Sequence, residues 1–375
     1  MAHDMKLGVL LFPVPGASAQ LARMVEELGF DSLVFADTQN ITPEVWGQLM
    51  LAARDTERIE LGTGVTNPGT RDAAVTASAA LALQVESRGR AFCGIGRGDS
   101  SLAKIGRKPV SVDEFEVYVE RLQGYLRGDS VDRDGTPSRL EWHGEVEVPK
   151  VPLEIGATGK KVIELAARHA ERIVFALAAA EERLERAIET ARRAAAASGR
   201  DPDALRLGAW INAVVHPDFA AARDAVRGGL SAFAHFSGFA GMKPEAMDPS
   251  LREAALHLRS NYDVRDHGRA DTAHARALDD DFVDRFGIVG PVETAVPRFE
   301  RLAKLGLDFC RVVPGSRDAA RDVVTASMMT LATIVRPAWR RRRPASTRGK
   351  RIDAAVDTRR DRRLYARQPC PRFSA

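Results

Sequence analysis

The segment Ile59-Glu60-Leu61-Gly62-Thr63-Gly64-Val65 is followed by a helical pattern over 72–87 and then by Ala91-Phe92-Cys93-Gly94-Ile95. Both flanking segments are short and apolar, which is typical of buried parallel strands. The helical stretch between them is long enough to return the chain to the start of the next strand. Residues 59–95 therefore predict a strand–helix–strand unit with parallel strands.

The same alternation continues on both sides of this unit. Short apolar runs, each a candidate strand, occupy 7–12, 32–36, 59–65, 91–95, 151–155, 172–176, 207–215 and 309–313. Helical patterns lie near 17–28, 43–54, 72–87, 113–126, 160–169, 181–198, 219–236 and 292–305, with a last helix near 319–335. Eight strand–helix pairs in strict alternation favour an α/β fold of the (β/α)8 TIM barrel type over an open sheet. Any site is then expected at the C-terminal ends of the strands.

Two segments exceed what a minimal barrel needs. Residues 128–149, before strand five, are rich in turn residues, and Asp134-Gly135 is a hairpin signal. Residues 237–285, between the seventh helix and strand eight, contain several short helical patterns. Long insertions on a barrel often form lids or substrate walls.

The composition is that of an ordinary globular protein. Of the 375 residues 45% are hydrophobic and 28% charged, which excludes a wholly disordered or collagen-like chain. No apolar run approaches the length of a membrane-spanning helix, and the N-terminus lacks the pattern of a secretory signal. Three cysteines without metal-ligand spacing fit a reducing compartment. We expect a cytoplasmic protein with no membrane partner, in which Cys93 and Cys310 are buried.

The net charge of +4 is unevenly distributed. Residues 337–375 hold 13 Lys or Arg and 3 Asp, a balance of +10, so the rest of the chain carries −6. A basic run without apolar periodicity is typical of a solvated, disordered extension. We expect a barrel domain over 1–336 and a disordered basic tail over 337–375, with no nucleic acid as a partner.

Polar residues and glycines follow strands two and three. Asp37, Thr38, Gln39 and Asn40 come after strand two and suit a polar ligand, unless Asp37 or Asn40 only caps the next helix. After strand three, glycines flank Thr63 and precede Val65-Thr66-Asn67-Pro68. Glycines in a strand often mark a bulge or a close ligand. A flat cofactor ring could pack against the barrel mouth where these glycines provide no side chains. The alternative is that the glycines form a bulge and that no ligand binds there.

Strand four runs into Gly94-Ile95-Gly96-Arg97-Gly98-Asp99. The dinucleotide fingerprint requires glycine where Asp99 stands, so that motif is rejected. The glycines allow a ligand to approach the backbone. Asp99 offers a carboxyl group that can act as a proton donor if burial raises its pKa. An ion pair of Asp99 with Arg97 or Arg107 is the structural alternative.

Strand five leads through Gly156-Ala157-Thr158-Gly159-Lys160-Lys161 into a helix. The phosphate-loop motif fails, because Glu154 and Lys161 stand where it requires glycine and Ser or Thr. Free backbone N–H groups at a helix N-terminus, one hydroxyl and two lysines still favour a phosphate. The eight histidines are scattered, and the sequence predicts no metal site and no Ser-His-Asp triad.

Over residues 6–335 the chain resembles the bacterial luciferase-like superfamily of flavin- and F-420-dependent oxidoreductases. It is most similar to members like methylenetetrahydromethanopterin reductase, which use coenzyme F-420. The resemblance is carried by the segments 28–33, 58–68, 94–99, 156–160 and 287–293, which occur in the family's order.

The resemblance implies a cofactor ring over a bulge in strand three, with a non-proline cis peptide at Gly64–Val65. It implies a cofactor phosphate at 158–161 and an acidic residue, Asp99, beside the ring. We expect Asp99 to exchange the proton that accompanies hydride transfer, with Asp37 as the second candidate. The cofactor-binding residues expected in this way are Thr38, Gln39, Gly64, Val65, Thr66, Asn67, Gly96, Arg97, Gly98, Gly156, Ala157, Thr158, Gly159 and Lys160.

We expect an oxidoreductase that transfers a hydride between coenzyme F-420 and a small organic substrate, with a pterin-linked one-carbon unit as one candidate. Thr38 replaces a histidine found in the sugar-phosphate and alcohol branches, which makes a sugar phosphate less expected. The alternative is an FMN-dependent monooxygenase supplied by a separate flavin reductase. A cofactor-free binding protein is a third hypothesis. A homodimer is a candidate assembly, because dimers are common in the resembling family.

Overall fold

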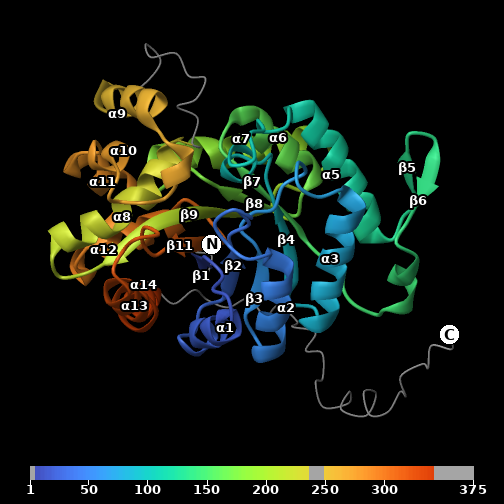
Figure 1. Ribbon diagram of the computed structural model, residues 1–375, viewed down its shortest axis with the longest axis horizontal. Coiled ribbons are helices and arrows are strands. Elements are labelled where there is room, and N and C mark those ends of the chain that lie inside the picture. The colour runs from blue at the N-terminus through green and yellow to red at the C-terminus, as the bar shows by residue number, and fades with distance from the viewer. Residues whose placement is uncertain (1–4, 236–248, 342–375) are drawn as a thin grey trace. The chain divides into compact units, whose positions relative to one another are not determined.

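The computed structural model describes residues 5–235 and 249–341. Eight parallel strands close into a barrel (Figure 1): β1 (Lys6–Leu11), β2 (Ser32–Phe35), β3 (Glu60–Thr63), β4 (Ala91–Ile95), β7 (Leu153–Ala157), β8 (Arg172–Phe175), β9 (Arg206–Val215) and β11 (Phe309–Val313). Each strand pairs with the next in this order, and β11 pairs back with β1, where Lys6 lies opposite Phe309. The predicted (β/α)8 fold is confirmed.

Helices pack around the barrel close to their predicted positions: α1 (Ser18–Glu27), α2 (Val45–Asp55), α3 (Ala73–Glu86), α5 (Val112–Arg127), α6 (Lys160–His169), α7 (Glu181–Ala197) and α12 (Val292–Lys304). The last helical segment runs through α13 (Arg321–Thr330), a π-helical turn (Leu331–Val335) and α14 (Arg336–Arg341). Residues 337–341, which we expected to belong to the tail, therefore form most of α14. The rest of the expected tail, 342–375, lies outside the described residues.

The hydrophobic core has an outer and an inner part. The outer part lies between strands and helices and contains both Cys93 and Cys310, which are fully buried as expected. The inner part fills the barrel with alternate strand residues, among them Phe92 and Phe309. A Cβ on Gly208 would overlap the Phe309 ring, so glycine at this position makes room for an aromatic side chain inside the barrel.

The insertion before the fifth barrel strand contains the predicted hairpin. It consists of β5 (Val131–Arg133) and β6 (Thr136–Ser138), which pair antiparallel, and a 3-10 helix, η1 (Glu141–Glu145), follows. Asp134 and Gly135 both adopt positive φ, at 56° and 92°, as a two-residue hairpin turn requires. In Figure 1 this hairpin projects from the barrel on the side opposite α12.

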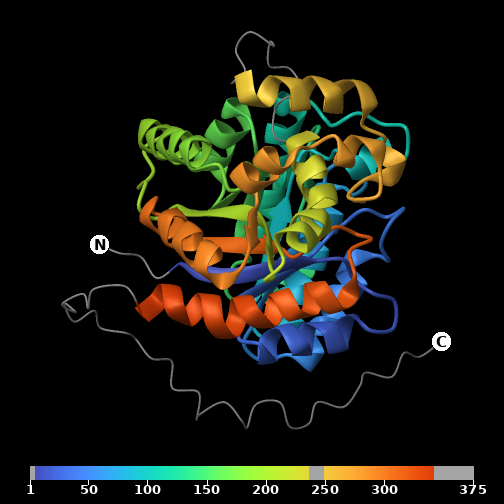
Figure 2. The same ribbon diagram turned by 90° about the vertical axis from the view of Figure 1, so that its left-hand side faces the viewer.

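The second insertion begins earlier than expected. The helix predicted over 219–236, the seventh along the chain, is present, but it does not lie in the outer layer of the barrel. Helix α8 (Phe219–Ala234) packs with the insertion: α9 (Pro249–Asn261), η4 (Val264–Asp266), α10 (Ala273–Arg276), α11 (Asp280–Phe286) and the short strand β10 (Ile288–Gly290). Figure 2 shows α9 to α11, in yellow and orange, grouped above the strands, away from α1.

The physical reason is a separate hydrophobic core. Buried residues of α8 such as Val226 and Leu230 pack with Phe282 and Phe286 of α11, not with the outer core. The outer layer at this position is filled by α12, whose Phe299 and Leu302 belong to the outer core. Because β9 is ten residues long, its last three residues extend to pair with β10. Within the described residues, no helix has both the length and the apolar character that a bilayer span requires.

Candidate active site

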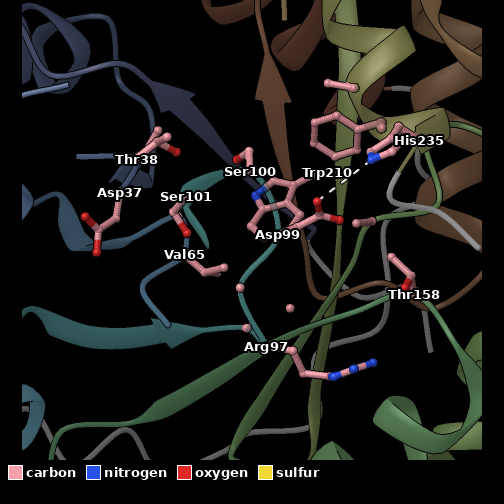
Figure 3. A pocket seen from close by; sticks show the side chains of 18 of the residues that line it. Asp37, Thr38, Val65, Arg97, Asp99, Ser100, Ser101, Thr158, Trp210 and His235 are labelled. Atoms are coloured by element: carbon pink, nitrogen blue, oxygen red, sulfur yellow. Dashed lines mark ion pairs between the residues drawn. The ribbon is translucent and has the colours of Figure 1, made fainter. Parts of the chain in front are cut away.

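A cavity of about 640 Å³ lies at the C-terminal ends of the barrel strands, within the usual size range of small-molecule sites. It is lined by segments that follow β3, β4, β7 and β11 and by residues of α8. Most of the predicted site residues line it: Asp37, Thr38, Gly64, Val65, Thr66, Gly96, Arg97, Gly98, Asp99, Gly156, Thr158, Gly159 and Lys160. Figure 3 shows side chains from separate strand ends converging on this space.

The peptide bond between Gly64 and Val65 is cis, which confirms the expectation for the strand-three bulge. Val65 projects into the cavity (Figure 3). A Cβ on Gly96 would lie 3.0 Å from the Val65 side chain, and a Cβ on Gly156 would lie 3.2 Å from the Trp210 ring. Glycine at these two positions therefore lets Val65 and Trp210 pack close to the backbone, and neither position adds a side chain of its own to the cavity wall.

Asp99 faces the cavity from the loop after β4. It is the residue before α4 (Ser100–Ala103), yet its side chain makes no capping hydrogen bond. Its Oδ1 lies 3.9 Å from Nε2 of His235 (Figure 3), so the ion pair forms with His235 and not with Arg97 or Arg107, the partners weighed from sequence. Burial raises the pKa of Asp99, while His235 and Arg97 act in the opposite direction. The direction of this shift favours a carboxyl group that exchanges a proton with a ligand in the cavity.

Asp37 has a different environment. Arg71 Nη1 donates to its Oδ2 at 2.6 Å and to Thr66 Oγ1 at 3.2 Å, and Arg71 Nη2 donates to Glu44 Oε1 at 2.8 Å. Burial raises the pKa of Asp37, and Arg71 opposes this rise. Asp37 does not cap the following helix, because Glu44 accepts from the Gly47 N–H at the start of α2. The ion pair fixes Asp37 in the cavity wall.

The N-terminus of α6 lies at one end of the cavity. Gly159 is its N-cap residue and provides no side-chain cap, so the first backbone N–H groups of the helix are not satisfied by a side chain. Thr158, Lys160 and Lys161 line the cavity here, and Lys160 is largely exposed beside Glu164 at 3.7 Å. Backbone donors, a hydroxyl and two ammonium groups make a site for an anion such as a phosphate.

Three predicted residues do not line the cavity. The Gln39 side chain donates to the Ser101 carbonyl oxygen at 2.8 Å. Asn67 is buried and donates to Ser101 Oγ at 3.0 Å, while its amide oxygen accepts from two backbone N–H groups of the loop after it. Ala157 is buried in the outer core. Gln39 and Asn67 hold the loop around Ser101, so in this arrangement they support the cavity wall from behind.

Sequence reasoning missed several side chains that line the cavity. They are Trp210 of β9, Phe233 and His235 of α8 and its end, and His267 and Arg317 of later loops. Trp210 and Phe233 meet edge to face at 6.0 Å, and the indole Nε1 of Trp210 is buried without a hydrogen-bond partner. One signal was present: four of the eight histidines lie between 235 and 274. Nothing in the sequence pointed to Arg71 as the partner of Asp37.

The features of this site fit a flavin-like cofactor. A side-chain-poor slot around Val65 accepts a flat ring, the uncapped α6 N-terminus accepts a phosphate, and the buried Trp210 Nε1 offers a donor beside the cavity. The model of the luciferase-like monooxygenase family matches residues 5–308. The chain belongs to this family. It is an oxidoreductase of the luciferase-like type.

Its similar relatives include reductases from archaea. The 5,10-methylenetetrahydromethanopterin reductase of Archaeoglobus fulgidus is 30% identical over 305 residues, covering 78% of this chain and 87% of the relative. The enzyme of the same name from Methanolobus tindarius is 28% identical over 305 residues, covering 80% and 89%.

Solved structures with the same fold include a reductase and a monooxygenase. The coenzyme F-420-dependent tetrahydromethanopterin reductase from Methanopyrus kandleri matches with a TM-score of 0.69 at 24% identity, over 89% of this chain and 99% of that chain. A monooxygenase from Streptomyces bottropensis matches with a TM-score of 0.62 at 21% identity, over 89% of this chain and 100% of that chain. At these identities, the likeness demonstrates the shared fold.

Proposed function

We propose that this oxidoreductase transfers a hydride between coenzyme F-420 and a small organic substrate. The observation that carries the proposal is the continuity of two features in one cavity: the glycine-lined slot beside Val65 and the uncapped N-terminus of α6. The first accommodates a flat ring and the second a phosphate group. When bound, the deazaflavin supplies the hydride, and the protein supplies orientation and electrostatics.

Each part of the cavity wall then has a task. The cofactor ring contacts Val65, Gly96 and Gly156. Its phosphate group binds to Thr158 and the first N–H groups of α6. Asp99 exchanges the proton that accompanies hydride transfer. Asp37 is the second candidate for that exchange. Its ion pair with Arg71 makes it a better positioning group than a donor, since a carboxylate paired with a guanidinium carries no proton to give to the substrate.

The finer proposal concerns the substrate. Relatives at 27–30% identity are named methylenetetrahydromethanopterin reductase, which favours a pterin-linked one-carbon unit. The cavity offers apolar and aromatic surface from Phe12, Trp210 and Phe233 in addition to the polar groups described, and such surface suits an aromatic substrate stacked near the cofactor.

The alternative is an FMN-dependent monooxygenase supplied by a flavin reductase, and the monooxygenase structures with the same fold support it. Titration of the full-length protein with F-420 and with FMN, followed by fluorescence quenching, separates the two. We expect F-420 to bind at least 10-fold more tightly. Preference for FMN would reject the proposal in favour of the alternative, and failure to bind either would favour a cofactor-free binding protein.

Turnover is tested next with reduced F-420 and 5,10-methylenetetrahydromethanopterin, by following the absorbance of the oxidised cofactor. Oxidation that depends on this substrate supports the pterin proposal. Tight F-420 binding without such oxidation would restrict the proposal to another organic substrate. The homodimer stays a prediction, to be measured by light scattering on the purified protein.

A further inference from the structure

A group of imidazole and phenol side chains from the second insertion lies against Asp99. His235, at the end of α8, stacks on the ring of Tyr262 with centroids 4.0 Å apart and planes 8° from parallel. The Tyr262 hydroxyl lies 2.5 Å from Nδ1 of His267. His274 packs against the other side of the group, 4.6 Å from the Tyr262 ring centroid. The insertion therefore assembles a clustered set of titratable groups at the cavity wall.

We propose that His235 is a second proton-exchanging residue of the site, sharing one exchangeable proton with Asp99, and that Tyr262 and His267 are positioning residues that hold its imidazole ring. This inference rests on the proposed function, because it assigns the source of the proton that accompanies hydride transfer. It goes further by giving the insertion a chemical role beyond enclosing the cavity.

The geometry supports a shared proton. Asp99 and His235 both line the cavity, and their side chains keep 40% and 32% exposure, so a substrate atom has access to both. The Oδ1–Nε2 separation of 3.9 Å exceeds a direct hydrogen bond, and a bridging substrate atom or a small side-chain rotation closes it. Asp99 is not committed to capping α4, so its carboxyl group is available for this exchange.

The Tyr262–His267 contact joins two neutral groups. Burial lowers the pKa of His267 to about 3, so its ring is neutral at ordinary pH, and burial raises the pKa of Tyr262, so its hydroxyl stays protonated. The Tyr262 hydroxyl and Nδ1 of His267 therefore share a hydrogen bond in which neither group is charged. With its hydroxyl fixed in this way, the Tyr262 ring presents a flat face to His235 and restricts the rotation of the imidazole.

The charges around the pair favour a single shared proton. Burial raises the pKa of Asp99 and lowers the pKa of His235, and each opposes the shift of the other. On the Asp99 side the nearby charge is Arg97. The titratable groups near His235 are Tyr262, His267 and His274. Two cationic side chains, Arg317 and Lys104, lie beyond His267. Because the groups interact, the protons come off in steps that belong to the pair.

The proton balance follows from the proposed reaction. During reduction the pair would give one proton to the heteroatom of a carbon–heteroatom bond of the substrate, and that bond (a C–N bond or the π bond of C=O or C=N) breaks as its carbon gains a new C–H bond. The hydride would come from a C–H bond of the reduced cofactor, which supplies the two electrons, and the pair would take one proton back from solvent. In the opposite direction the pair accepts the proton. Loss of the pair's proton at high pH is thus expected to slow substrate reduction.

Nuclear magnetic resonance of the full-length chain tests the coupling without any substrate. The protein is labelled at histidine Cε1, loaded with oxidised F-420 and titrated with pH, and the His235 signal is assigned with His235→Gln. Removing the carboxylate in Asp99→Asn is expected to move the His235 midpoint to lower pH, because imidazolium loses a nearby negative charge. The matched control is His143→Gln. His143 lies in η1, which follows the β5–β6 hairpin, so this substitution is expected to leave the His235 midpoint unchanged.

Two further variants separate positioning from general stability. Tyr262→Phe keeps the ring and loses the bond to His267, and Tyr262→Leu loses the stacking surface as well. We expect the His235 signal to broaden progressively in this order, while the F-420 dissociation constant stays within a factor of three. In the turnover assay, His235→Ala is expected to lose roughly 100-fold in kcat, and added imidazole is expected to restore part of it.

The outcomes are distinguishable from failure of the proposed function. If F-420 does not bind, the function itself fails. If F-420 binds but the His235 midpoint is the same in wild type and Asp99→Asn, the shared proton is rejected while the function stands. Full turnover in His235→Ala would equally overturn the inference. A lowered midpoint together with imidazole rescue supports it.

Discussion

Asp99 is the residue on which the proposed chemistry depends most directly. Asp99→Asn keeps the shape of the side chain and removes its acid–base function. We expect kcat to fall roughly 100- to 10,000-fold with F-420 affinity nearly unchanged, because the carboxyl group faces His235 across the cavity and does not belong to the phosphate-binding segment.

The measurement is steady-state turnover with a parallel fluorescence titration of F-420. Asp113→Asn is the matched control, since Asp113 is exposed in the first turn of α5, and it should preserve both quantities. A parallel loss of affinity and turnover in Asp99→Asn would mean that Asp99 has a structural role in the cofactor site.

At the scale of single elements, the N-terminus of α6 is the proposed anion site. Thr158→Val removes one hydroxyl donor and Lys161→Met one ammonium group, while both leave the helix N-terminus in place. A hydrogen bond to a charged group contributes about 1.5–3 kcal/mol, so Thr158→Val is expected to weaken F-420 binding roughly 10- to 100-fold.

The dependence of F-420 binding on salt concentration is a second test of the proposed anion site at α6. Exposed charges are screened at high ionic strength, so added NaCl should weaken F-420 binding in the wild type more than in Lys161→Met. Lys304→Met, at the end of α12 in the outer layer, is the control and should match the wild type. Equal salt dependence in Lys161→Met and wild type would exclude Lys161 from the anion site.

Helix α1 is tied to the start of β3 by Glu26. Its carboxylate accepts from the backbone N–H groups of Glu57, Arg58 and Ile59 at 2.6–3.2 Å. Burial alone would raise the pKa of Glu26, but these hydrogen bonds outweigh it and the pKa is lowered. A lowered folded-state pKa adds stability above the unfolded pKa of about 4.3, and this stability is lost as pH falls through the folded value.

We therefore expect Glu26→Gln to lower the free energy of unfolding by about 1–3 kcal/mol at pH 7. The difference from wild type should shrink below about pH 4. Urea unfolding at a series of pH values measures this. The neighbouring Glu27 is exposed, so Glu27→Gln is the control with little effect. A deficit that persists unchanged at pH 3 would show that the carboxylate charge is not what stabilises this junction.

At the scale of the whole molecule, an ion pair crosses the barrel interior. Arg311 of β11 is bidentate to Glu154 of β7, with Nη2–Oε2 at 2.8 Å, and both side chains are almost fully buried. The guanidinium carbon lies 4.7 Å from the Phe92 ring centroid and 4.5 Å from that of Phe309. Removing one partner leaves a buried charge without compensation.

Glu154→Leu or Arg311→Met is each expected to cost about 3–5 kcal/mol of unfolding free energy, whereas the double variant Glu154→Leu/Arg311→Met recovers most of it. Urea unfolding followed by tryptophan fluorescence measures both. The exposed pair of Glu189 with Arg193 is the comparison, and Glu189→Gln should change stability by less than about 0.5 kcal/mol. Additive losses in the double variant would indicate that the two side chains act independently.

The positions of many strands and helices could be predicted from local sequence patterns. Strand β4 was predicted to the residue, and helix α6 likewise, because apolar periodicity and bounding glycines are properties of neighbouring residues. The strand-three bulge and its cis peptide at Gly64–Val65 followed from the family resemblance. Helix α8 was predicted to within two residues, but its periodicity is that of any amphipathic helix and does not tell which of two cores it packs against.

The sequence by itself determined the alternation of strands and helices that builds the barrel and the glycines near the ends of β3, β4 and β7, because each pattern depends on residues close together along the chain. Only the tertiary structure showed which side chains the two candidate carboxyl groups contact. Arg71 pairs with Asp37 and His235 with Asp99, and Tyr262 and His267 pack behind His235. Those contacts join residues far apart in sequence. They form because barrel closure brings all strand ends to one mouth and the insertion folds over it, a geometry that no local pattern encodes.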